Sequence, residues 1–351
     1  MTACPAGAQA VERLTERGRC RAARFPATNR PMPFLAFLAS VLLFVGAGSL
    51  SAQERWTAAK LEDEGLPPEI VAETRQPAPE GLPDGLVATH DGDGDIAAAW
   101  YGGPTTRYRH GALGDTIEAS VLIARTAGGS LVSFTLPLTE VFEDRYPRLA
   151  DLDGDGTVEI VTIRSSLLQG ASVTVYGLDG DSLVERATTG FIGFANRWLN
   201  IAGIARFRGA RSREIAFVRT PHMGGTLFFC EYADGALRFV AEMSGFSNHA
   251  LGSTELRLSA VADIDGDGRP DLALPSADRK ALRVVGFTDE RLTELATAAL
   301  PHAIDKAIAV DGSARRTRFI VALETGEVYA VHPGRWPLWN VPRPPPLPAS
   351  R

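Results

Sequence analysis

Asp151-Leu-Asp-Gly-Asp-Gly-Thr-Val-Glu159 and Asp263-Ile-Asp-Gly-Asp-Gly-Arg-Pro-Asp271 are two copies of one nine-residue pattern. Each copy has carboxylates at positions 1, 3, 5 and 9, and a glycine at position 6 that permits a sharp turn. Calcium ions take six to eight oxygen ligands at about 2.3–2.6 Å, and alternate residues of such a loop point their oxygens inward. With the carbonyl of position 7, the expected ligands are Asp151, Asp153, Asp155, Thr157 and Glu159, and then Asp263, Asp265, Asp267, Arg269 and Asp271. The sequence therefore predicts two calcium sites.

The segments that follow the two loops exclude the EF-hand as the source of this pattern. An EF-hand needs a bidentate glutamate at position 12 and a helix on either side. Position 12 is Thr162 in the first copy and Leu274 in the second. The following residues are β-branched or apolar and soon meet turn residues, which is typical of strands. Each loop is therefore expected to connect two β-strands.

A strand-like segment of this kind recurs five times, which indicates a repeat protein. The copies begin at Asp95, Glu159, Glu214, Asp271 and Arg318. A short apolar stretch precedes each copy, at least one more follows it, and most units add a turn and a fourth stretch. Four short strands in a unit of about 45–60 residues match one blade of a β-propeller.

This repeat resembles the FG-GAP/VCBS family of β-propellers, which includes the calcium-bearing blades of integrin α-subunits. The resemblance covers roughly residues 84–333. It implies an all-β protein, a β-propeller of about five four-stranded blades (six possible), with calcium loops between the first and second strands. The metal role carries over only to the units of Asp151 and Asp263. The first unit, 90–95, is shortened by two residues, and the third and fifth units have arginines at 208–213 and 315–316 where the acids should be.

The start of the chain has the features of a secretory signal peptide. Residues 34–48 are an uninterrupted apolar run with arginines upstream and small residues after it. We expect residues 1–52 to be a signal peptide with an upstream extension, and the protein to be secreted or periplasmic. An uncleaved membrane anchor is the alternative, because the uncharged run is about 20 residues long. Cleavage would leave Cys230 as the only cysteine, expected to be a buried apolar residue without a disulfide.

Charge and composition limit the remaining choices. The formal net charge is −6, and removal of residues 1–52 would leave about −10, which disfavours nucleic acid and anionic membranes as partners. A membrane contact is expected only if the N-terminal segment stays uncleaved. Residues 53–83 are interpreted as a linker or docked arm, 84–333 as the propeller, and 334–351 as a proline-rich tail.

Unusual polar residues gather in the loops between second and third strands and in the links between units. In an up-and-down blade these segments emerge on the face opposite the calcium loops. The candidate ligand face consists of Arg107, Arg109, His110, Arg145, Asn196, Arg197, Asn248 and His249, with His302 as a looser relative. A ring of cationic and amide donors suits a glycan or a carboxylate-bearing partner. Solvated loop residues and hydrogen bonds between blades are the alternative interpretation.

The sequence therefore favours an extracytoplasmic, calcium-stabilised β-propeller that acts as a binding or scaffold module for a protein or glycan. The alternative is a polysaccharide-acting enzyme with its site at the channel mouth, where Asp115 or Glu118 near His110 would perform acid–base chemistry. No Gly-x-Ser-x-Gly, His-Glu-x-x-His or phosphate-loop motif is present, so we expect no enzyme activity. A third possibility is a cell-surface assembly held by the uncleaved N-terminal segment.

Overall fold

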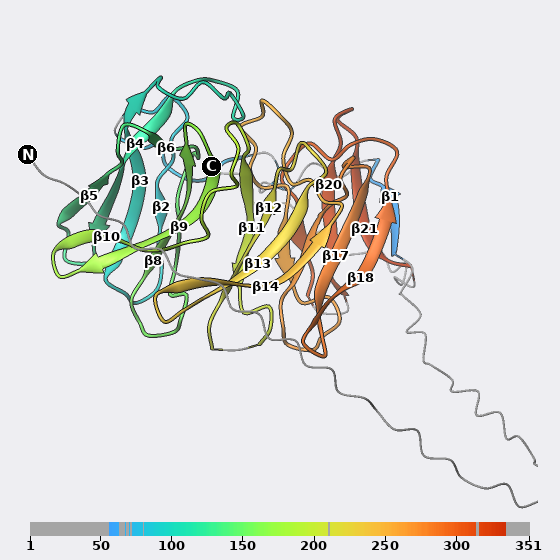
Figure 1. Ribbon diagram of the computed structural model, residues 1–351. Helices are drawn as coiled ribbons and strands as arrows, with labels where there is room; N and C mark the ends of the chain where they lie inside the picture. Colours follow the sequence, from blue (N-terminus) through green and yellow to red (C-terminus); the bar gives the residue numbers. More distant parts are fainter. Residues whose placement is uncertain are drawn as a thin grey trace, which may run out of the picture. The chain divides into compact units, whose positions relative to one another are not determined.

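The computed structural model describes residues 56–62, 67, 70, 72–79, 81–209, 211–313 and 316–334. The expected signal peptide and all but the first residue of the expected proline-rich tail lie outside these residues. The named elements of the described part are strands, β1 to β21, and their pairings are antiparallel (Figure 1). The all-β prediction is confirmed. Within the same residues, no helix is long and apolar enough to cross a membrane.

The strands form five antiparallel groups of four, numbered here in chain order. Group 1 is β2 (Ala88–Thr89), β3 (Ile96–Thr105), β4 (Glu118–Thr126) and β5 (Leu131–Thr135), and group 2 is β7 (Arg148–Ala150), β8 (Glu159–Ser166), β9 (Gly170–Asp179) and β10 (Ser182–Thr188). Strand β6 (Glu140–Phe142) pairs with both β4 and β8, so groups 1 and 2 form one sheet of nine strands.

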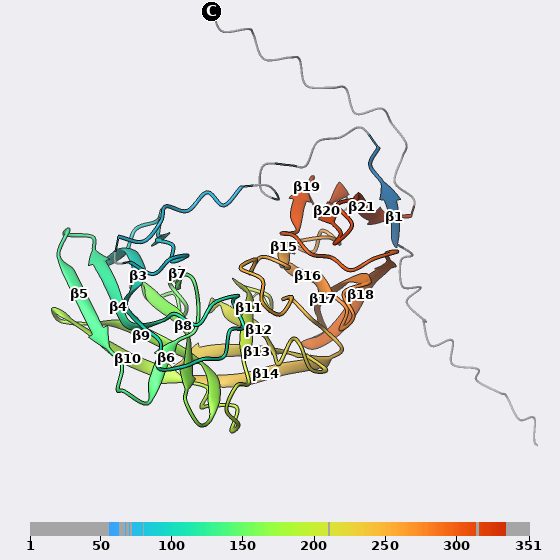
Figure 2. The same ribbon diagram turned by 90° about the horizontal axis from the view of Figure 1, so that it is seen from above.

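The later groups are separate four-stranded sheets. Group 3 is β11 (Leu199–Ala205), β12 (Glu214–Arg219), β13 (Thr226–Ala233) and β14 (Ala236–Ser244), and group 4 is β15 (Ala260–Ala262), β16 (Asp271–Pro275), β17 (Ala281–Thr288) and β18 (Arg291–Ala299). Group 5 is β19 (Ala309–Asp311), β20 (Arg318–Ala322), β21 (Val328–Pro333) and β1 (Trp56–Lys60). Consecutive groups lie beside one another, as Figure 2 shows.

The hydrophobic core is divided into layers between consecutive groups. Separate clusters of buried side chains lie between groups 1 and 2, 2 and 3, 3 and 4, and 4 and 5. Strand β8 is covered on both faces, and all eight of its residues are buried. Its buried polar residues are Glu159, Thr162, Arg164, Ser165 and Ser166. Outer strands such as β18 instead alternate between exposed and covered residues. Cys230 is fully buried between groups 2 and 3, as the sequence predicts.

Strand β1 corrects the interpretation of residues 53–83 as a linker or docked arm. Residues 56–60 pair along their whole length with β21, and the two strands lie side by side in Figures 1 and 2. Trp56 is buried, and its ring stacks on Phe319 at a centroid distance of 5.9 Å. The predicted repeat region of 84–333 therefore lacks the strand that completes group 5.

Because β1 contributes its largest apolar side chain to the core, we expect Trp56→Ala to lower the free energy of unfolding by about 3 kcal/mol. Thr57→Ala, on the exposed face of the same strand, should change it by less than about 0.5 kcal/mol. Urea unfolding followed by fluorescence and circular dichroism measures both. Equal stability of the two variants would show that β1 does not contribute to the folded core.

Candidate functional site

The two acidic loops are the first candidate site. Residues 151–158 connect β7 to β8, and residues 263–270 connect β15 to β16, so both join the first strand of a group to its second, as predicted. In each loop the carboxylates of positions 1, 3 and 9 bring one oxygen each to within 4.8 Å of one another: Asp151, Asp153 and Glu159, and likewise Asp263, Asp265 and Asp271. Both groups of acids could hold a metal ion.

The hydrogen bonds inside the two loops are the same. The ninth side chain accepts the main-chain N–H of position 2, which is Leu152 for Glu159 at 2.7 Å and Ile264 for Asp271 at 2.9 Å. The first aspartate accepts the N–H of position 4 at 2.6 Å in both loops. Glycines at positions 4 and 6 adopt positive φ in both loops, between 77° and 95°. Two unrelated loops would not share this pattern by chance.

The ninth carboxylates create an electrostatic demand for a cation. Glu159 and Asp271 are about 95% buried. Burial and the neighbouring carboxylates raise the pKa of each to about 7. Three carboxylates held together at the edge of the core are stabilised by a positive charge among them. The donor set consists of hard oxygens, which fits calcium or magnesium rather than a thiolate-seeking metal.

The residues at positions 5 and 7 were also predicted as ligands, but in both loops their side chains contact each other. Asp155 accepts the N–H and the hydroxyl of Thr157, at 2.7 and 2.8 Å. Asp267 forms an ion pair with Arg269 at 2.6 Å. Asp155 and Asp267 therefore lie outside the two groups of acids, and they stabilise the turns.

Groups 3 and 5 have arginines in the corresponding places. In group 3, Arg208 lies 3.9 Å from the buried Glu214, which is the counterpart of Glu159, and 3.4 Å from Glu231. In group 5, Arg318 opens the second strand and pairs with Asp311 at 2.6 Å. A guanidinium thus supplies the positive charge where the acidic pattern is lost.

Neighbouring groups hold the first acidic loop from both sides. Asp95 of group 1 accepts the N–H of Val158 at 2.8 Å. From group 3, Arg213 donates to the carbonyl of Asp151, and Arg211 donates to the carbonyl of Gly154. The conformation of this loop is therefore coupled to the contacts of group 2 with both of its neighbours.

At the other end of the strands, the long segment between β3 and β4 crosses to later groups. Tyr108 accepts the N–H of Asn196 at 3.2 Å, and Ala112 accepts the N–H of Gly252 at 2.9 Å. Leu113 is buried in the core layer between groups 2 and 3. The insertion therefore reaches the links between groups, as the sequence suggested, but it packs against them instead of leaving an open ring.

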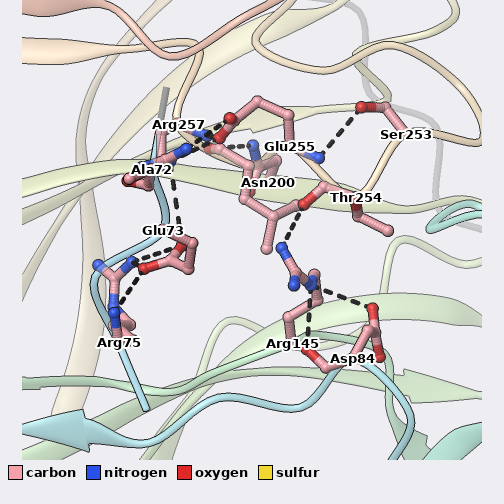
Figure 3. A network of polar contacts seen from close by, with 11 residues as sticks. Ala72, Glu73, Arg75, Asp84, Arg145, Asn200, Ser253, Thr254, Glu255 and Arg257 are labelled. Atoms are coloured by element: carbon pink, nitrogen blue, oxygen red, sulfur yellow. Dashed lines mark hydrogen bonds and ion pairs between the residues drawn. The ribbon is translucent and has the colours of Figure 1, made fainter. Parts of the chain in front are cut away.

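Several residues of the predicted ligand face are buried connectors, which corrects the open ring of donors expected there. Asn248 and Asn200 each donate a side-chain N–H to the other's carbonyl, at 3.2 and 3.1 Å, and His249 is fully buried beside them. Figure 3 shows Arg145 between Asp84, its ion-pair partner at 3.0 Å, and the carbonyl of Thr254. The sequence repeat placed these residues at one end but could not give the direction of their side chains.

The remaining predicted residues differ in exposure. Arg107 donates to the carbonyl of Glu140 at 2.8 Å, and Arg197 donates to that of Asn196 at 3.2 Å. Arg109 is exposed and forms no hydrogen bond or ion pair within the described part of the chain, and His302 is also exposed. With Asn196, which is also exposed, these two are the open positions of the predicted face.

His110 belongs to a buried polar cluster that the sequence did not fully show. Its Nδ1 forms a hydrogen bond with Oε1 of Glu143 at 2.6 Å, and the other oxygen of Glu143 accepts the hydroxyl of Ser165 at 2.5 Å. Glu143 is fully buried, whereas the side chain of His110 is 13% exposed. The bond to Glu143 orients the imidazole, and Nε2 of His110 forms no hydrogen bond within the described residues.

Two histidines in contact with each other, His222 and His249, lie beside this cluster. The carbonyl of Ser253 accepts Nε2–H of His249 at 2.9 Å, so Nδ1 of His249 accepts Nε2–H of His222 at 2.8 Å. Burial lowers the pKa of His222 to about 4 and that of His249 to about 3, which keeps both rings neutral. Trp198 packs against both rings. The contact joins residues 27 positions apart, and no local sequence pattern predicts it.

A cavity of about 1060 Å³ lies among the first strands of the groups and is called the axial cavity here. All five groups contribute to its wall, through Thr89, Ala150, Ile201, Ser259 and Ile308. Residues 72–75 border it as well, and Arg257 links this segment to group 4 by donating to the carbonyl of Ala72 at 3.1 Å (Figure 3). The predicted propeller implies a central channel, but no sequence pattern shows which residues line this cavity.

Comparisons with known proteins give distant similarities only. No protein-family model matches the sequence, and no curated protein matches it. The Bacillus licheniformis rhamnogalacturonan lyase PL11 is 18% identical over 74% of this chain and 52% of its own, with a TM-score of 0.47. Rhamnogalacturonan lyase YesW is 14% identical over the same shares, at 0.46, and BBS1N in complex with ARL6DN is 10% identical over 71% and 65%, at 0.39. The chain spans about half the length of the two lyases, and likeness at this level assigns neither a family nor an activity.

Glu118 provides a test of the buried cluster. Burial and the charge of Glu143 raise the pKa of Glu118 from 4.5 to about 10. Such a carboxyl binds more protons in the folded state, so the stability it contributes is present below about pH 4.5 and is lost as the pH rises toward 10. We expect Glu118→Gln to match the parent protein near about pH 5 and to be more stable at about pH 9.

Urea unfolding at both pH values measures this difference. Glu242→Gln, an exposed site on β14, is the matched control and should show no change with pH. Parallel pH profiles for the parent protein and Glu118→Gln would mean that Glu118 is ionised in the folded state.

Proposed function

We propose that this protein is a calcium-stabilised β-propeller of the FG-GAP/VCBS type that acts outside the cytoplasm as a binding module. Five groups of four antiparallel strands around an axial cavity correspond to five blades. In this proposal β1 closes the ring, because a strand from the early part of the chain completes the last blade.

The two acidic loops carry the proposal. Their internal hydrogen bonds are the same, their ninth carboxylates are buried, and their donors are the hard oxygens that calcium prefers. Asp151, Asp153 and Glu159 would hold one ion, and Asp263, Asp265 and Asp271 the other, with main-chain carbonyls and water completing each shell. The ion would supply charge neutralisation at the blade edge.

Calcium in the first loop would stabilise more than one blade. Asp95, Arg211 and Arg213 attach this loop to blades 1 and 3. A cation that fixes the loop also fixes the carbonyl and amide groups that these side chains hold. In a chain whose predicted mature part has no disulfide, such links take over the stabilising role that disulfides have in many secreted proteins.

Calcium should raise the melting temperature by mass action. Extracellular calcium sites bind at about 10⁻⁴–10⁻³ M, and an ion at 100 times its dissociation constant adds about 2.7 kcal/mol per site. Thermal melts in millimolar calcium and in chelator should therefore differ by several degrees. Identical melting curves would contradict the metal assignment.

Asp153→Ala and Asp265→Ala should each remove one ion, because each deletes a carboxylate from one group of acids. Native mass spectrometry should find two ions in the parent protein and one in each variant. Asp93→Ala is the control, since the shortened loop of blade 1 does not gather three acids. A third ion that disappears with Asp93 would show that the first blade also binds calcium.

A second candidate function is a polysaccharide-acting enzyme, and His110 is the observation that favours it. A partly exposed imidazole whose far nitrogen is held by a buried carboxylate is the arrangement that orients a general base. It lies at the end of the blades opposite the calcium loops, where the sequence placed the alternative catalytic site.

If the protein is such an enzyme, His110→Ala should lower the rate of polysaccharide cleavage by about 100-fold or more, because general acid–base catalysis contributes about 10²–10⁴. The release of new chain ends from a panel of neutral and acidic polysaccharides measures the rate. His302→Ala, an exposed histidine at the same end, is the control. Absence of turnover by the parent protein on the whole panel would exclude this candidate.

A further inference from the structure

The axial cavity has the properties of a ligand site, and we propose that it takes an acidic oligosaccharide. The inference rests on the proposed binding function and deepens it, because it moves the ligand from the predicted face of links and loops to the axis. Pockets for small molecules typically have volumes of about 300–1,000 Å³. The axial cavity, at about 1060 Å³, has room for several sugar rings.

Buried and exposed residues both line the cavity. Tyr146 and Leu256 are buried, and Leu113 of the β3–β4 insertion packs in the same core layer as these two. At the acidic-loop end the lining residues Gly92 and Asp93 are exposed. One entrance for a ligand therefore lies between the loops that precede β3 and β8.

One guanidinium of the wall can bind an anion, because the other three are already paired with carboxylates. Four arginines and three carboxylates line the cavity, in a protein with formal net charge −6: Arg75, Arg148, Arg213, Arg257, Glu73, Asp93 and Asp151. Arg75, Arg148 and Arg257 have carboxylate partners. The Arg213 side chain donates to the main-chain carbonyl of Asp151, and no carboxylate pairs with it in the described residues. Its guanidinium at the entrance is available to a ligand carboxylate.

The rest of the wall fits a hydroxyl-rich ring compound. Thr89, Ser259 and His90 offer hydroxyl and imidazole groups, while Leu149 and Ile308 provide apolar surface. Sugar rings present polar edges and apolar C–H faces, so a mixed wall of this kind suits them. A sugar acid adds the carboxylate that Arg213 can bind.

Calorimetry in millimolar calcium tests the inference with short oligomers of polygalacturonate, polyglucuronate and alginate. Each oligomer is paired with its carboxyl-reduced form, which keeps the rings and removes the charge. We expect at least one acidic oligomer to bind, and carboxyl reduction to weaken that binding about tenfold or more. No binding by any of the three, or equal binding of the reduced form, would overturn the inference.

Two variants locate the site, and a third serves as the control. Arg213→Gln and His90→Ala should each weaken binding about tenfold. His90→Ala is included because Arg213 also holds the carbonyl of Asp151, so that its loss could disturb the loop. Arg109→Ala, exposed at the opposite end, should bind like the parent protein. Loss of binding in Arg109→Ala alone would return the ligand to the predicted face of links and loops.

The calcium melts keep the two proposals separable. A calcium-dependent melting temperature without oligosaccharide binding would leave the calcium-stabilised propeller in place and overturn only the cavity inference. Oligosaccharide binding without any effect of calcium on the melting temperature would support the cavity inference and contradict the calcium sites.

Discussion

A buried charge at the start of the second strand is the constraint to which each sheet responds. An ionised group at the edge of a core is costly unless an opposite charge or hydrogen bonds accompany it. Groups 2 and 4 place Glu159 and Asp271 there and surround them with further acids, which calls for a cation. Group 3 places Glu214 there and supplies Arg208 instead. One position in the repeat thus has two kinds of surroundings, a group of acids that could hold a metal ion or an internal guanidinium.

This constraint separates the two ends of the strands by role. At one end lie the acidic loops and the arginines that pair with buried carboxylates. Side chains there also join neighbouring groups, as Arg213 and Asp95 do for the first loop. At the other end, Asn200 and Asn248 exchange hydrogen bonds across a link, and the β3–β4 insertion covers the links from outside. The first end has the groups of acids that could hold a metal ion, and the second is partly covered by packing.

Much of the fold could be predicted from the sequence, because the second strand of each group begins with a recognisable pattern. An acidic or basic residue followed by an apolar run identified the starts of β8, β12, β16 and β20 directly, and that of β3 to within one residue. Strand β1 was missed because Trp56-Thr-Ala-Ala-Lys60 has a single large apolar residue, and its partner β21 lies near the other end of the described chain. Local pattern carries no information about such a distant pairing.

The metal loops were predictable for a similar reason, since all their acids lie within nine residues of chain. The exposure of the residues on the predicted ligand face was not predictable, because segments of similar sequence can differ in burial. Phe194-Ala-Asn196 and Phe246-Ser-Asn248 share a pattern, yet Phe194 is 71% exposed and Phe246 is fully buried. Asn196 adopts a positive φ of 55° and stays at the surface, whereas Asn248 is fully buried. What surrounds each link decides its conformation, and those surroundings come from other parts of the chain.

The pairing of β1 with β21 also sets the order in which the molecule can be completed during synthesis. Residues 56–60 are made before the other strands, yet their partner is not available until residue 333 has been added. Throughout elongation the early strand has unpaired amide and carbonyl groups, and such an edge invites pairing with other chains. The groups in between can fold one by one, but the last sheet waits for a long-range contact, which slows folding. A chaperone that shields the early segment of the nascent chain would therefore protect it during its most vulnerable period.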